Sequence, residues 1–164
     1  MSDRYNCELL IGGKLTQSKV KELVDMLCMS EWYVQWDDGG GSDESRLIDE
    51  LKDSDGTNPH FTQHDTAVPL QDELFDFLQE NKLAYHFHIS SDGVYDGEIQ
   101  WWYPDYASTK SARADVNATA SVATRDELRK LLSDGLTLAQ VVGAMDDMPP
   151  TLPKFIIVKD EPST

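Results

Sequence analysis

Carboxylates are the chemically active residues that this chain concentrates most strongly in one region. From Asp53 to Thr109 there are 11 Asp and Glu residues and one basic residue, Lys82, so the segment carries −10 of the formal net charge of −16. Negative charge of this density attracts basic side chains and repels phosphate groups. We therefore expect a basic protein surface as the partner, and no direct binding to nucleic acid or to a membrane.

A helix predicted from Pro69 to about Lys82 organises the clearest part of this charge. Apolar residues recur there at helical spacing. They are Leu70, Leu74, Phe77 and Leu78. On the far side, Asp72, Asp76 and Glu80 follow one another at intervals of four residues, which is about 6 Å along a helix axis. This separation is comparable with the distance between phosphates along a DNA strand.

The spacing of these acids leads to our main functional hypothesis. The protein would be a non-enzymatic inhibitor that occupies the basic groove of a nucleic-acid-binding or defence protein as a nucleic-acid mimic, as inhibitors from mobile elements do. A solvated helix face is the alternative reading of the same pattern, and a structural or assembly subunit is an alternative function. The candidate partner-binding residues are Asp72, Glu73, Asp76, Glu80, Asp92, Asp96, Glu98 and Trp102.

Four histidines raise the further alternative of a small metal-dependent enzyme. His60 and His64 are four residues apart, and His86 and His88 alternate along a predicted strand. Zinc requires three or four converging ligands, but the chain has no His-Glu-x-x-His pattern, and the first pair lies in a segment, Ser54 to Ala67, that is predicted to be a loop. We therefore expect no metal site and no cofactor.

Other motifs that would indicate catalysis or DNA reading are incomplete. The glycine run Gly39–Gly41 lacks the Lys-Ser/Thr that completes a phosphate-binding loop, and no pair of acids stands out as catalytic. Two predicted helices between Thr124 and Met145 have the length of a helix-turn-helix, but the second contains no Lys or Arg to contact DNA. Cys7 and Cys28 fall on inward faces and suit the core.

The segment Ala84–Tyr103 is predicted to be the central hairpin of the fold. Its two arms alternate apolar and polar residues, with turn residues between them. We expect a single core face formed by Tyr85, Phe87, Ile89, Ile99, Trp101 and Tyr103. Trp102 would then point to the opposite face, beside His86 and His88, either exposed as a binding residue or covered by a helix of the same chain.

The remaining elements complete an α+β prediction: a mainly antiparallel sheet of about five to six strands with four to five helices packed on it. Further strands are predicted at 5–11, 31–37, within 112–122, and as a buried run at 155–158. Further helices are predicted from Thr16, at 45–52, and within 124–145, where Thr124 and Thr137 each open a capping box. The 164 residues suit one domain, 1–164. The start of the chain lacks the apolar core of a signal peptide, which leads us to expect a cytoplasmic protein.

Overall fold

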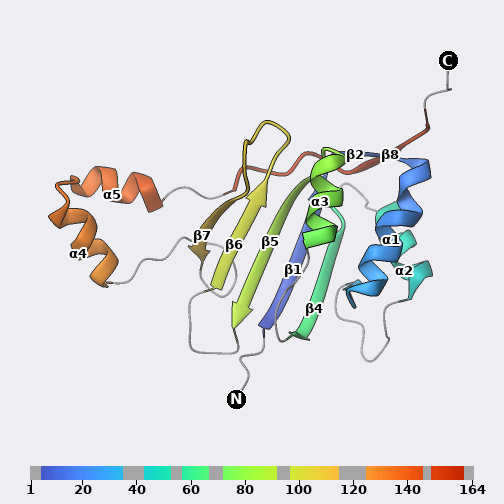
Figure 1. Ribbon diagram of the computed structural model, residues 1–164, viewed down its shortest axis with the longest axis horizontal. Coiled ribbons are helices and arrows are strands. Elements are labelled where there is room, and N and C mark those ends of the chain that lie inside the picture. The colour runs from blue at the N-terminus through green and yellow to red at the C-terminus, as the bar shows by residue number, and fades with distance from the viewer. Residues whose placement is uncertain are drawn as a thin grey trace.

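A six-stranded antiparallel sheet forms the frame of the protein, in the order β3-β4-β1-β5-β6-β7 (Figure 1). The computed structural model describes residues 5–34, 43–52, 57–66, 72–91, 97–114, 125–145 and 149–160. The strands are β1 (Tyr5–Gly12), β3 (Tyr33–Val34), β4 (His60–Thr66), β5 (Ala84–Ser91), β6 (Gly97–Trp102) and β7 (Lys110–Ala114). With the helices described below, this sheet confirms the predicted α+β class.

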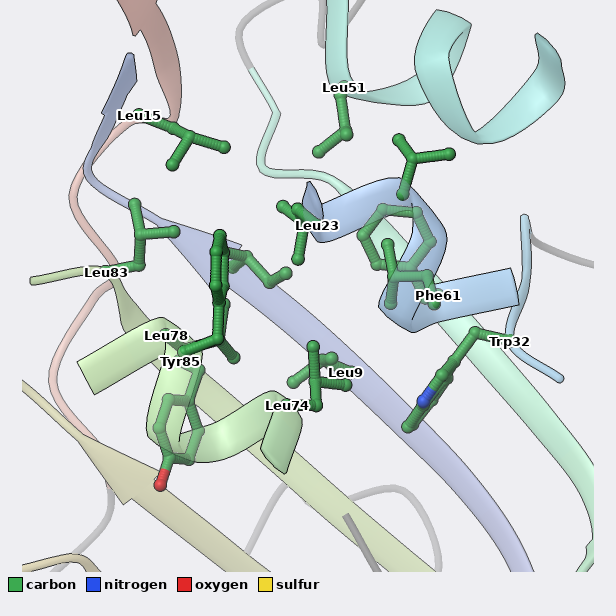
Figure 2. Close-up of a cluster of buried hydrophobic side chains, with 14 of the residues drawn as sticks. Leu9, Leu15, Leu23, Trp32, Leu51, Phe61, Leu74, Leu78, Leu83 and Tyr85 are labelled. Carbon is green, nitrogen blue, oxygen red and sulfur yellow. The ribbon is translucent and has the colours of Figure 1, made fainter. Parts of the chain in front are cut away.

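Three helices pack on one face of this sheet and close the main core. They are α1 (Val20–Met29), which follows a short 3₁₀ turn η1 (Gln17–Lys19), α2 (Glu44–Lys52) and α3 (Asp72–Glu80). Figure 2 shows Leu23 of α1, Leu51 of α2, Leu74 of α3 and Leu9 of β1, which belong to one cluster of buried side chains. These side chains follow the 3.6-residue and two-residue periods of their elements, so the sequence pattern explains which face each element buries.

Two further helices, α4 (Arg125–Ser133) and α5 (Leu138–Met145), lie side by side beyond the β7 edge of the sheet. Among the described helices, none combines the length and the apolar character needed to cross a membrane. The capping box predicted at Thr137 is confirmed, because Thr137 and Gln140 exchange hydrogen bonds between side chain and backbone at 2.9 and 3.3 Å. The box predicted at Thr124 lies outside the described residues.

The end of the chain forms a separate two-stranded parallel sheet, which corrects one prediction. β8 (Ile156–Val158) pairs with β2 (Lys14–Thr16) and not with the main sheet. Phe155 is buried as predicted, but Ile156 is exposed. A strand of three residues paired on one side covers little of its own surface, so the continuous apolar run does not become a central strand.

The predicted loop Ser54–Ala67 is also wrong, because β4 runs through it. β4 lies between β1 and β3 and pairs antiparallel with both. Only Phe61 of its seven residues is a large apolar residue, and its side chain is fully buried. The strand is held by its two neighbours in the sheet, and backbone pairing of this kind leaves no apolar alternation in the sequence.

The register of the β5–β6 hairpin differs by one residue from the prediction. Tyr85 lies opposite Trp102, and His86 lies opposite Trp101. Trp102 therefore shares the helix-covered face with Tyr85, whereas Trp101 packs with Ile99 on the other face. A shift of one residue exchanges the two faces of a strand. Trp101 and Trp102 are adjacent and both buried, so the sequence does not decide which of them faces the helices.

Two predicted strands are shorter in the described part of the chain. β3 contains only Tyr33 and Val34, and residues 35–37 of the prediction lie outside the description. β7 ends at Ala114, and residues 115–122 likewise lie outside it. The helix predicted from Pro69 begins, within the described residues, at Asp72.

Candidate functional site

The acidic helix α3 is fixed in place by its apolar side. Leu74, Phe77 and Leu78 are buried in the main core. The helix ends in a hydrogen-bonded C-terminal turn. The backbone amide of Leu83 donates to the carbonyl of Leu78 at 2.8 Å, and the backbone amide of Lys82 donates to the carbonyl of Gln79 at 3.0 Å. This pairing is a Schellman motif, so the outward face of α3 has a defined orientation.

Three candidate acids lie together on that outward face. Glu73, Asp76 and Glu80 are exposed, and their spacing of three and four residues places them within one stripe of the helix. The segment Asp72–Glu80 contains no Lys or Arg, and no ion pair between described residues involves these three acids. Asp72 begins α3, and its side chain lies outside the description.

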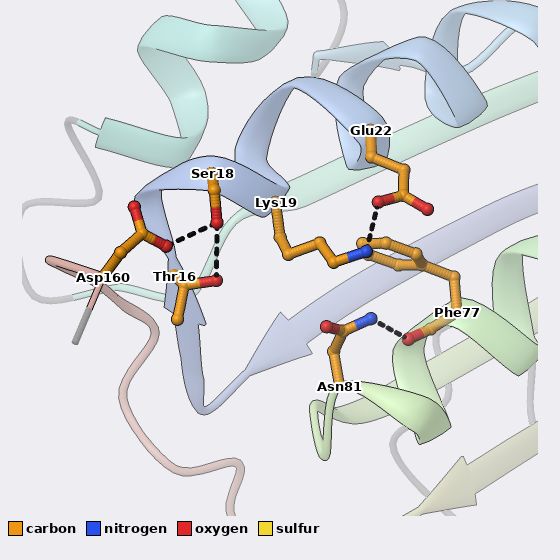
Figure 3. Close-up of polar contacts among 7 residues, drawn as sticks. All are labelled: Thr16, Ser18, Lys19, Glu22, Phe77, Asn81 and Asp160. Carbon is orange, nitrogen blue, oxygen red and sulfur yellow. Dashed lines mark hydrogen bonds and ion pairs between the residues drawn. The ribbon is translucent and has the colours of Figure 1, made fainter. Parts of the chain in front are cut away.

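Lys19, a basic residue whose ammonium lies near Phe77 of α3, is already paired with a carboxylate. The ammonium of Lys19 lies 2.6 Å from a carboxylate oxygen of Glu22 and 5.9 Å from the centre of the Phe77 ring (Figure 3). On α1, a carboxylate oxygen of Asp25 likewise lies 3.4 Å from the ammonium of Lys21. The acids of α1 are therefore paired with bases, in contrast to those of α3.

The other candidate partner-binding residues belong to the segment of β5, β6 and their connection, and not to α3. Glu98 is half-buried and accepts a hydrogen bond at 3.0 Å from the side-chain amide of Gln100, and it lies opposite Arg113 of β7. Asp92 and Asp96 lie outside the described residues. Trp102 is only 7% exposed and its ring stacks with that of Tyr85, with 6.5 Å between centroids. Trp102 is thus a core residue, which corrects its assignment as a partner contact.

All four histidines lie on the two strands beside β1, and three of them, His60, His64 and His88, act on a residue that the sequence did not single out. His60 and His64 belong to β4, His86 and His88 to β5, and Glu8 stands between them on β1, directly opposite His88 and Thr62. Nε2 of His60 is 3.6 Å from a carboxylate oxygen of Glu8. The nearby imidazole of His60, and then the charges of His88 and His64, lower the pKa of Glu8 in spite of its desolvation.

The polar atoms of this histidine cluster differ in burial and in hydrogen bonding. His88 is 4% exposed, and its Nε2 is buried with no hydrogen-bond partner among the described residues, as is Oγ1 of Thr62. Nδ1 of His64 is 3.2 Å from the side-chain oxygen of Asn6. Within the described ranges, no group of three or more His, Cys, Asp or Glu side chains is arranged to hold a metal ion.

Sequence reasoning missed Glu8 because it assigned β4 to a loop. Once Cys7, Leu9 and Ile11 are placed inward, Glu8 must face the other side of the sheet. The two strands that bring histidines to it could not be identified as its neighbours.

No family model matches the chain, and no curated protein or solved structure matches it either.

Proposed function

We propose that the protein is a non-enzymatic, acidic interaction protein that binds a basic protein surface through the outward face of α3. The face consists of Glu73, Asp76 and Glu80, and we call it the α3 acidic face. In this proposal it occupies a groove in which the partner would otherwise bind nucleic acid.

The observation that carries the proposal is the difference between α3 and its neighbour α1. The acids of α1 have basic partners at 2.6 and 3.4 Å, whereas Glu73, Asp76 and Glu80 are exposed and have no described ion pair. Exposed like charges three and four residues apart on a helix oppose its stability by a few tenths of a kcal/mol per pair. A basic partner would remove that repulsion.

The geometry of α3 suits recognition of regularly spaced positive charges. Along the helix axis, Glu73 and Asp76 are separated by about 4.5 Å, and Asp76 and Glu80 by about 6 Å. The phosphates of a DNA strand rise by about 3.4 Å per nucleotide along the duplex axis and lie further apart along the backbone, so the spacing of the acids is of the same order. Because the buried side of α3 fixes the helix, little conformational freedom would be lost on binding.

The net charge of the chain supports rapid association with a basic partner. A formal charge of −16 produces a long-range field that steers a positive surface toward the protein. Exposed charges act mainly on the association rate, and salt screens them over about 8 Å at physiological ionic strength. Binding should therefore be fast and strongly dependent on salt.

The proposal can be tested with two triple variants that change the net charge by the same amount. The first, Glu73→Gln/Asp76→Asn/Glu80→Gln, neutralises the α3 acidic face. The second, Glu22→Gln/Asp25→Asn/Glu44→Gln, neutralises acids that are paired with Lys19 or Lys21. The probe is a labelled deca-arginine peptide, and its affinity is measured by fluorescence anisotropy at several salt concentrations.

We expect the first variant to lose at least several-fold more affinity than the second, and to show a smaller salt dependence than the wild type. Equal losses in the two variants would mean that the peptide responds only to overall charge. The α3 acidic face would then be a solvated helix face, and the proposal would be rejected.

A further inference from the structure

The segment 149–160 runs along one end of the main sheet, where residues far away in the chain hold it. Figure 1 shows it passing from the side of β6 and β7 toward α1. The carbonyl of Pro150 accepts a hydrogen bond from the hydroxyl of Tyr103. The carbonyl of Pro153 accepts one at 2.8 Å from the side-chain amide of Asn58. We call this segment the C-terminal strap.

Strand pairing holds the second half of the strap. β8 adds to β2 as a parallel strand, and the amide of Ile156 donates to the carbonyl of Gly13 at 2.9 Å. After β8, Asp160 accepts a hydrogen bond from the hydroxyl of Ser18 (Figure 3). Addition of an extended strand to a neighbouring strand is one of the ways in which proteins bind separate peptides.

Only one residue of the strap is buried. Phe155 is 1% exposed and belongs to the main core cluster, whereas its neighbours Lys154 and Ile156 are exposed. The strap also contains three prolines, which have no amide hydrogen to donate and favour extended backbone. A single apolar anchor within an extended segment is typical of a bound peptide, because backbone pairing supplies affinity and a pocket for one side chain supplies specificity.

The surface under the strap allows a close approach of its backbone. A Cβ atom on Gly12 would clash with the carbonyl oxygen of Pro153, so a glycine is needed at this crossing. Gly13 follows with a φ of 114°, a conformation that also favours glycine. We call the surface formed by Gly12, Gly13, Asn58 and β2 the strap groove. It belongs to the body of the protein, and it fits an extended segment with an aromatic residue at the position of Phe155.

The strap differs in charge from the rest of the chain. It contains Lys154, Lys159 and Asp160 and has a formal charge of +1, so the remaining residues together carry −17. Both lysines are exposed, and no ion pair between described residues involves them. The field of so acidic a body attracts a basic segment to its surface, whether that segment belongs to this chain or to another protein.

From these observations we propose that the strap groove is a binding site for an extended basic segment of a partner protein, and that the C-terminal strap is its displaceable occupant. The partner segment pairs with β2, places an aromatic side chain where Phe155 lies and releases the strap. Because the strap belongs to the same chain, its effective concentration at the groove is high, and the partner segment must compete with it. The site uses none of the residues of the α3 acidic face.

The test uses a labelled peptide with the sequence of residues 149–160 and variants of the full chain that weaken the strap without changing the groove. Phe155→Ala removes the anchor and Phe155→Leu reduces it, and circular dichroism checks that both remain folded. By fluorescence anisotropy, Phe155→Ala should bind the peptide at least about tenfold more tightly than the wild type, with Phe155→Leu between them. A peptide that itself carries Phe155→Ala should bind at least about tenfold more weakly.

Two combined variants separate this site from the proposed function. Phe155→Leu is joined either to the α3 triple variant or to the triple variant of the paired acids, which removes the same charge. The two combinations should bind the peptide equally. A weaker α3 combination would place the peptide on the α3 acidic face and overturn the strap groove as its site. Equal peptide binding by wild type, Phe155→Leu and Phe155→Ala would also overturn it. A wild-type dimer that the peptide dissociates would assign the groove to a second copy and overturn the basic partner.

Hydrogen exchange of the wild type provides an independent test that needs no variant. The amide of Ile156, bonded to Gly13, should exchange through release of the strap alone. Amides of β1, which lies between β4 and β5, require wider unfolding. After correction for intrinsic rates, we expect exchange at Ile156 to be at least about tenfold faster than in β1. Equal protection would show that the strap opens only with the whole sheet, and the proposal would be rejected.

Discussion

Nε2 of His86 lies 2.9 Å from the phenol oxygen of Tyr103, and this hydroxyl in turn donates to the carbonyl of Pro150. The three groups connect β5, the end of β6 and the start of the C-terminal segment. Burial lowers the pKa of His86 from 6.5 to about 4 and raises that of Tyr103 to about 12. Both side chains are therefore neutral at physiological pH and act as a structural link.

This link predicts a pH dependence of stability. Because the folded pKa of His86 lies below its unfolded value, its contribution is complete above pH 6.5 and is lost as the pH falls toward 4. One proton taken up on unfolding gives a slope of at most about 1.4 kcal/mol per pH unit, and partial exposure of His86 reduces it. Urea unfolding of wild type and His86→Gln between pH 7 and 4 should show a shallower slope in the variant. Parallel slopes would contradict the assignment.

The pairing of Tyr85 with Trp102 predicts a measurable coupling between their side chains. Both rings are buried on the helix-covered face, with 6.5 Å between centroids. Each change to alanine should cost about 3–5 kcal/mol, and a double-mutant cycle should give a coupling of about 0.5–1.5 kcal/mol. The same cycle for Tyr85 and Trp101, which point to opposite faces, should give a coupling near zero. Equal couplings would mean that the observed register is wrong.

Two helix C-terminal turns contain a residue whose conformation suits glycine. Glu31 after α1 has a φ of 56°, and Lys82 after α3 has a φ of 55°. A left-handed conformation costs a non-glycine residue about 1–2 kcal/mol, while glycine loses more entropy on folding. We expect Glu31→Gly and Lys82→Gly each to stabilise the protein by about 0.5–1 kcal/mol, as measured by urea unfolding.

These two variants control for each other, because they change the net charge in opposite directions. If one stabilises and the other destabilises, the effect arises from charge and not from the backbone.

Gly12 marks the point where the C-terminal segment crosses the sheet. A Cβ atom on Gly12 would clash with the carbonyl oxygen of Pro153, which also accepts a hydrogen bond at 2.8 Å from the side-chain amide of Asn58. We expect Gly12→Ala to cost about 1–3 kcal/mol through overpacking and to increase proteolysis near Pro153. The matched variant is Gly143→Ala, because its Cβ would meet no described residue within 4 Å. This variant should be neutral or stabilising by up to about 1 kcal/mol.

The predictable part of the fold consists of elements whose apolar residues recur clearly with the period of a helix or a strand. β1, α1, α2 and the apolar side of α3 follow directly from residues such as Leu9, Leu23 and Leu51, since burial imposes the period of each element. β4 could not be found in this way, because neighbouring strands hold it through its backbone. The hairpin register could not be decided either, because Trp101 and Trp102 are both buried on opposite faces.

The same distinction applies to the candidate site. The exposure of Glu73, Asp76 and Glu80 follows from the period of α3 and was predictable. The absence of an ion pair to these acids among the described residues was not predictable, because it depends on where Lys19 and Lys21 lie in space. The position of Glu8 among the histidines likewise depends on strand order, which residue types alone do not specify.

The central claim is that the α3 acidic face selects a basic partner, and differential capture from a lysate of the native host tests it most directly. Wild type, the α3 triple variant and the triple variant of the paired acids are immobilised at equal density, and captured proteins are quantified by mass spectrometry at low and physiological salt. We predict that wild type and the paired-acid variant retain the same basic protein, that the α3 variant loses most of it, and that salt releases it. Equal capture of the same proteins by all three, with the same salt dependence, would contradict the account.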